Sequence, residues 1–204
     1  MASSSVEVCS KALALIGIPA IASFDEGTDA AAACELMYEN VVERLLGDND
    51  WRFAMTKARL SRLNETPANE WTYAYQLPSN RDGNLFAAFN TDAVGAVPFK
   101  DYEIFGETLL TNAAEVYIDY KIRVAEEDWP PYFTSLVIYA LAAHLAPSLK
   151  DSTSEADMWM RMAFGGADEG GKGGYFRTAV NLDAKASPSQ RIEDFSLINA
   201  RWGG

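Results

Sequence analysis

The chain has 204 residues, 49% of them hydrophobic and 12% aromatic, a composition that supports a buried core and excludes an intrinsically disordered protein. A formal net charge of −12 argues against sequence-specific DNA binding, because such binding depends on neutralising phosphates. No basic N-terminal segment leads into an apolar stretch, and no apolar run approaches the roughly 20 residues of a membrane span. We therefore expect neither a signal peptide nor a membrane partner.

Residues that commonly bind metals or cofactors are scarce. Cys9 and Cys34 are the only cysteines and fall in different predicted helices, so we interpret both as small core residues. His144 is the only histidine, which excludes a multi-histidine metal site. The sequence therefore predicts no cofactor and no metal.

The N-terminal part is predicted to form two amphipathic helices joined by a short link. The first covers Val6–Ile16; Gly17 would end it, and Pro19 would prevent it from resuming. The second begins at Thr28, a residue type that caps helices, and runs to about Asp48. Each helix has an apolar stripe, formed in the first by Val6, Cys9, Leu13 and Ile16 and in the second by Cys34, Tyr38, Val41 and Leu45.

Between residues 54 and 123 the hydrophobic period changes from helical to two, which indicates β-strands. The two clearest strands run over residues 71–77 and 116–122. Shorter strands are predicted at Thr56–Leu60, Leu85–Phe89, Tyr102–Phe105 and Thr108–Leu110. Because tight turns separate these strands, we expect a small antiparallel sheet.

Helical signals return at Asp128, and Tyr132–Ala146 is apolar on almost every side, as expected of a central helix. Ser152 and Glu155 form a capping box for the next helix, which would stop before Gly165. After Gly170 a glycine-rich link leads into a stretch without sustained periodicity.

These elements together predict an α+β fold. Its mainly α-helical bundle core would cover residues 1–53 and 124–170, with an inserted small antiparallel β region over 54–123. An extended, Gly-linked C-terminal arm would follow over residues 171–204.

Two groups of residues near the β region are candidates for contacts with other chains. The basic group would either protect a strand edge by its charge or face an acidic neighbouring subunit or passing DNA; it consists of Arg52, Lys57, Arg59 and Arg62. The aromatic group would either fill the sheet core or form a rigid interface; it consists of Trp71, Tyr73 and Tyr75.

The last residues, Ser187–Gly204, contain spaced apolar and basic side chains that a functionless tail would tend to lack. The segment would either order on a partner or pack on its own domain. Its candidate anchors are Arg191, Phe195, Leu197, Ile198, Arg201 and Trp202.

Enzymatic chemistry is the main alternative. Glu126 and Glu127 could supply a carboxylate acid for a virion-associated cell-wall hydrolase, and alanine at both positions would then abolish turnover. Adjacent acids just before a Pro-Pro helix start are more simply explained as complements to the helix dipole. A helical protein-interaction module without a virion role is a third possibility.

Several short motifs resemble, in their order, the head-to-tail adaptor family of tailed bacteriophages, which includes tail tubular protein A. The family's first helix ends in an Ile-Gly-x-Pro-like turn, read here as Ile16-Gly17-Ile18-Pro19, and an Ala-rich acidic helix and a Trp follow, read as Asp29–Cys34 and Trp51. Tyr75-Gln76-Leu77-Pro78 is similar to the family's Tyr-x-Leu-Pro segment. Further similarity covers Pro131–Ala146 and the C-terminal Ala200-Arg201-Trp202.

The resemblance implies a structural virion protein at the head-tail junction, made in the host cytoplasm and without enzymatic activity. Such adaptors form a ring, usually of twelve copies, beneath the portal protein, where the ring continues the DNA channel and carries the next tail (nozzle) protein. DNA would pass through without sequence-specific binding. The resemblance also implies that the C-terminal arm anchors the portal, that the β region faces the tail, and that the chain is a monomer before assembly.

Overall fold

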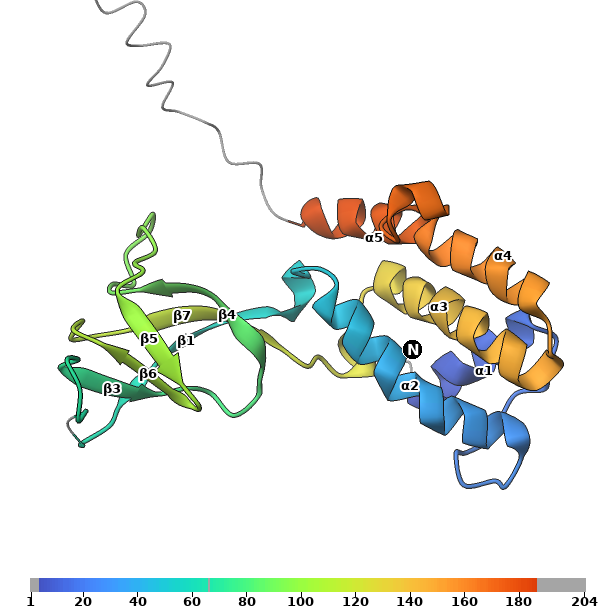
Figure 1. The fold of residues 1–204 in the computed structure, drawn as a ribbon, viewed down its shortest axis with the longest axis horizontal. Helices are drawn as coiled ribbons and strands as arrows, with labels where there is room; N and C mark the ends of the chain where they lie inside the picture. Colours follow the sequence, from blue (N-terminus) through green and yellow to red (C-terminus); the bar gives the residue numbers. More distant parts are fainter. Residues whose placement is uncertain (1–3, 66, 187–204) are drawn as a thin grey trace, which may run out of the picture.

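The structure is a computed structural model that describes residues 4–65 and 67–186, and over these residues the fold is α+β. The helices lie together in one region, and the strands lie beyond one end of it (Figure 1). The five described α-helices are α1 (Ser5–Leu15), α2 (Asp29–Gly47), α3 (Pro131–Lys150), α4 (Thr153–Phe164) and α5 (Gly174–Ala184). The predicted fold class is confirmed at this level.

α3 is the central helix of the helical region, as its apolar sequence predicts. It contacts α1, α2, α4 and α5, and its buried side chains run along its whole length from Phe133 to Ala146. Pro131 begins the helix at a position where a missing N–H costs no helical hydrogen bond.

Side-chain caps define where three helices begin. The hydroxyls of Ser4, Thr28 and Ser152 accept hydrogen bonds from backbone N–H groups three residues ahead, at 3.2, 3.2 and 3.3 Å. α1 ends at Gly17, which adopts a φ of +72° that most other residues avoid. The predicted caps at Thr28 and Ser152 and the predicted stop at Gly17 are confirmed. The predicted capping box is only half formed, because the Glu155 carboxylate pairs with Lys150 at 2.7 Å.

α5 corrects the prediction of an arm beginning at residue 171. Phe176 and Ala179 of this helix are buried against the helical region, and α5 contacts both α3 and α4. The glycines before it permit close packing: a Cβ on Gly174 would lie 2.6 Å from the backbone nitrogen of Gly165. The glycine-rich segment is thus a tight turn between two packed helices and not a loose link.

The strands form two antiparallel sheets rather than the single one expected. One sheet has the order β1-β7-β4, formed by Met55–Arg59, Tyr117–Ile122 and Arg81–Phe89. The other has the order β2-β3-β6-β5, formed by Ser61–Arg62, Tyr73–Gln76, Thr108–Thr111 and Tyr102–Phe105. The chain passes from the first sheet to the second at Leu60, which is buried between β1 and β2.

A second, smaller core lies within the β region. Alternate residues of the strands point inward and pack on one another, as the period of two predicts. The buried members are Leu60, Tyr75, Leu77, Ala88, Leu109, Val116, Ile118 and Tyr120. The β region therefore has its own hydrophobic interior, separate from that of the helices.

Two basic side chains at the end of β7 tie the β region to α2. The Lys121 Nζ donates hydrogen bonds to the carbonyl oxygens of Leu46 and Asn49, at 3.2 and 3.5 Å, where α2 ends. A cation there compensates the negative end of the helix dipole. Arg123 forms ion pairs with Glu39 of α2 and with Glu126, at 3.2 and 3.0 Å. The junction between the two regions is thus held by specific contacts.

Candidate functional site

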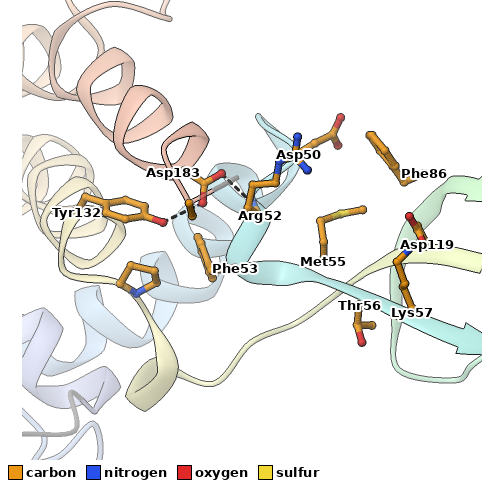
Figure 2. Close-up of a pocket in the computed structure, with 12 residues that line it drawn as sticks. Asp50, Arg52, Phe53, Met55, Thr56, Lys57, Phe86, Asp119, Tyr132 and Asp183 are labelled. Atoms are coloured by element: carbon orange, nitrogen blue, oxygen red, sulfur yellow. Dashed lines mark hydrogen bonds and ion pairs between the residues drawn. The ribbon is translucent and has the colours of Figure 1, made fainter. Parts of the chain in front are cut away.

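A pocket with a volume of about 680 Å³ lies at the junction of the two regions. Figure 2 shows Phe53, Tyr132 and Asp183 on the helical side of the pocket, and Phe86 and Asp119 on the β side. Its apolar lining comes from Phe53, Met55, Phe86, Pro130 and Tyr132, and its charged lining from Asp50, Arg52, Lys57, Asp119 and Asp183. Pockets that combine apolar walls with polar groups are typical of binding sites, and this pocket has about as many charged as apolar residues in its lining.

Phe86 is exposed in this pocket because of an irregularity in β4. Leu85 pairs with Tyr120, and Ala87 pairs with Asp119. The chain therefore advances by two residues on β4 but by one residue on β7, which makes Phe86 the extra residue of a β-bulge. Bulges change the direction in which a side chain points. Phe86 is 58% exposed as a result.

Asp183 is a buried carboxylate, 2% exposed, beside the pocket. Its Oδ2 accepts a hydrogen bond from the backbone N–H of Arg52, and its Oδ1 accepts one from the Tyr132 hydroxyl, both at 2.8 Å (Figure 2). Burial and this hydrogen bond raise the pKa of Tyr132 above its ordinary value. Asp183 therefore joins α5 to the start of α3 and to the short 3₁₀ helix Arg52–Ala54.

Replacing Asp183 with alanine is expected to lower the free energy of unfolding by about 1–3 kcal/mol, because the donors on Arg52 and Tyr132 lose their partner. Urea denaturation of the full chain measures the change. Asp157→Ala on α4 is the matched control, since Asp157 is exposed and should tolerate the substitution. Equal midpoints for the two variants would contradict the role assigned to Asp183.

The structure distributes the four candidate basic residues along the junction and an exposed sheet edge. Arg52 lines the pocket, whereas Lys57 and Arg59 lie on the edge strand β1 and pair with Asp119 and Glu115 at 2.6 and 2.7 Å. In the other sheet, the Arg62 guanidinium lies 4.5 Å from the ring centroid of Tyr73. Two of the four positive charges, those of Lys57 and Arg59, are therefore already paired with acids of the same chain.

The three candidate aromatic residues differ in accessibility. Tyr75 is 1% exposed and its hydroxyl donates a hydrogen bond to the Ala113 carbonyl at 2.7 Å, so it belongs to the β core. Tyr73 and Trp71 are half-buried, and the Trp71 Nε1 donates to Glu103 at 3.0 Å. Of these three residues, only Trp71 and Tyr73 therefore have exposed surface that another chain could contact. The predicted anchors between Arg191 and Trp202 lie outside the described residues.

The two acids considered for hydrolysis occupy different environments. The Glu126 Oε1 accepts hydrogen bonds from the Tyr38 hydroxyl and the Arg123 Nη2, both at 3.0 Å. Burial, followed by the nearby charge of Glu126, raises the pKa of Tyr38. Glu127 is exposed in the same 3₁₀ turn, Glu126–Asp128. Glu126 thus links the segment that follows the β region to α2 through its hydrogen bond with Tyr38.

Cys9 and Cys34 are both fully buried, as predicted, but they are not isolated from each other. The neighbouring Cys34 on α2, together with burial, raises the pKa of Cys9 on α1. His144 is half-buried on α3, and burial, followed by the charge of Arg44, lowers its pKa. No cluster of potential metal ligands is found in residues 4–65 and 67–186.

By length and composition, α3 could cross a membrane, with a mean hydropathy of 1.3. The central helix of a core passes the same test, and α3 lies among four other helices. Its apolar character is therefore explained by packing within this fold.

The pocket residues were mostly missed at the sequence level. Asp183 could have been found, because Phe176, Ala179, Val180 and Asp183 follow the spacing of a helix face. Phe86 could not, because its exposure depends on a bulge in the pairing of β4 with β7.

Over the described residues, the chain is a mixed α+β protein with a pocket between its helical and β regions. Comparison with models of known protein families finds no match. Comparison with curated proteins likewise finds no match.

Proposed function

We propose that the chain is a head-to-tail adaptor that forms a ring beneath the portal of a tailed bacteriophage. The observation that carries this proposal is the order of its motifs: a helix, the turn Ile16–Pro19, an Ala-rich helix, Trp51, and then a β insertion before the apolar helix that starts at Pro131. The resemblance rests on this order and not on any reactive group.

The motif residues also have structural roles that explain why their types are required. Gly17 has the positive φ that ends α1, and Trp51 is fully buried where the helical region meets the β region. The Trp51 Nε1 donates to the Leu45 carbonyl at 2.7 Å, and its ring contacts Phe133 edge-on at a centroid distance of 5.2 Å. Both motif residues therefore have a defined structural role in this fold.

In the proposed ring, the helices form the bundle core of each subunit, and the β region carries the tail-side surface. Trp71 and Tyr73 are its accessible aromatic candidates for contact with the nozzle protein. The arm that anchors the portal is Ser187–Trp202, so its beginning is moved past α5 relative to the sequence prediction. A ring contact is heterologous, so different patches of successive copies must be complementary.

The acidic charge is consistent with this proposal. DNA leaving the capsid would meet a protein with a formal net charge of −12 and would be repelled rather than retained. Sequence-specific binding plays no part in the proposed role.

Gel filtration with light scattering, first of the chain alone and then with its cognate portal ring, tests the proposal. We expect a monomer alone and a ring of copies migrating with the portal. A stable ring without portal would contradict the monomeric precursor. A chain that never migrates with the portal would contradict the adaptor role.

A further inference from the structure

The junction pocket is located where the chain leaves the described structure. Ala186, the last described residue, is itself part of the pocket lining, so the segment Ser187–Gly204 starts at the pocket edge. Phe195 is the first aromatic residue of that segment. An extended chain spans about 3.3 Å per residue, so Phe195 can lie anywhere up to roughly 30 Å from Ala186.

The pocket offers an apolar surface that lacks a cover among the described residues. Phe86, 58% exposed, lines the β side, and Phe53 and Met55 continue the apolar wall towards the helices (Figure 2). Removing such apolar area from water is favourable by about 25 cal/mol per Å². Burying an aromatic side chain in this pocket would therefore be favourable in free energy.

The pocket lining carries three aspartates and two basic residues, and among these Arg52 is the side chain that can pair with an acid of the segment. The Arg52 guanidinium makes no ion pair with the described residues, whereas Lys57 and Asp119 are paired with each other. Glu193 and Asp194 immediately precede Phe195. Inserting Phe195 beside Phe86 would bring these two acids towards the exposed Arg52.

We infer that the junction pocket is the docking site of the chain's own C-terminal segment, with Phe195 as its apolar anchor. The covalent link to α5 favours the chain's own segment over a second copy of the chain. A short linker gives an effective concentration in the millimolar range, which exceeds the micromolar concentration of a second copy. The inference does not depend on the adaptor role. If that role holds, the docked segment is held back until the portal competes for it.

Trypsin cleavage after Arg191 of the full chain, followed by mass spectrometry in the absence of portal, tests this docking. Phe86→Asp should accelerate the cleavage about tenfold, because proteolysis follows the population of the undocked segment. Phe105→Asp is the matched control, since Phe105 is similarly exposed, at 60%, on an edge strand outside the pocket. It should leave the rate unchanged.

Phe195→Ala provides a second, independent variant that leaves the folded regions intact. It should accelerate cleavage as much as Phe86→Asp, and combining the two substitutions should add little. Equal cleavage rates in the wild type, Phe86→Asp and Phe195→Ala would overturn the inference. Protection that grows with protein concentration would overturn it as well, because the occupant would then be a second copy.

Discussion

Replacing Trp51 with alanine is expected to lower the free energy of unfolding by about 3–5 kcal/mol. Trp51 is fully buried and contacts Phe133 of α3 and Phe176 of α5, at ring-centroid distances of 5.2 and 5.9 Å. The substitution would open a cavity where these helices meet the end of α2. It would also remove the hydrogen bond to the Leu45 carbonyl.

Chemical denaturation of the full chain, followed by circular dichroism, measures this loss. Trp71→Ala is the matched control, because Trp71 is half-buried and makes one exposed hydrogen bond to Glu103. We expect that substitution to cost about 1 kcal/mol or less. A similar loss at both positions would mean that Trp51 is not the central contact of the helical region.

Replacing Phe195 and Trp202 together with alanine is expected to weaken capture by the portal by about 30-fold or more. An aromatic hot spot contributes about 2 kcal/mol or more, and such losses are not additive, so the loss from a single anchor, about 30-fold, is the smallest effect expected. Circular dichroism of the variant checks that its helices and sheets still form. Sedimentation with purified portal rings measures the bound fraction.

Ser187→Ala combined with Ser189→Ala is the control for this prediction, because it changes the same segment without touching an aromatic anchor. It should bind the portal as the wild type does. Undiminished binding by the aromatic double variant would place the portal contact elsewhere on the chain.

Local patterns in the sequence predicted most of the helices. The stripe of Cys34, Tyr38, Val41 and Leu45 is buried on α2, and Thr28 caps that helix. These features depend on helical spacing and on hydrogen bonds between near neighbours in the chain, which a sequence displays directly.

The errors arose where distant residues decide the structure. The glycines before α5 were interpreted as a loose link, but Gly174 lies against Gly165 because two helices meet there. Likewise, Leu60 turns the chain from one sheet into the other, a change that strand periodicity does not reveal. Both outcomes depend on tertiary packing.

The junction pocket was beyond prediction for the same reason. Its lining comes from residues 50–57, 86, 119, 130–132 and 183–186, which are far apart in the sequence. The basic cluster was recognised, but its ion pairs with Asp119 and Glu115 depend on how β1 pairs with β7. A sequence shows the charged residues but not their partners.

The adaptor proposal requires that a tailed phage encodes this chain, and electron cryomicroscopy of the particles of that phage tests the central claim most directly. The account predicts a ring of density between portal and tail into which the five helices and two sheets fit, with the C-terminal segment against the portal. Complete, infectious particles without this chain at the head-tail junction would contradict it.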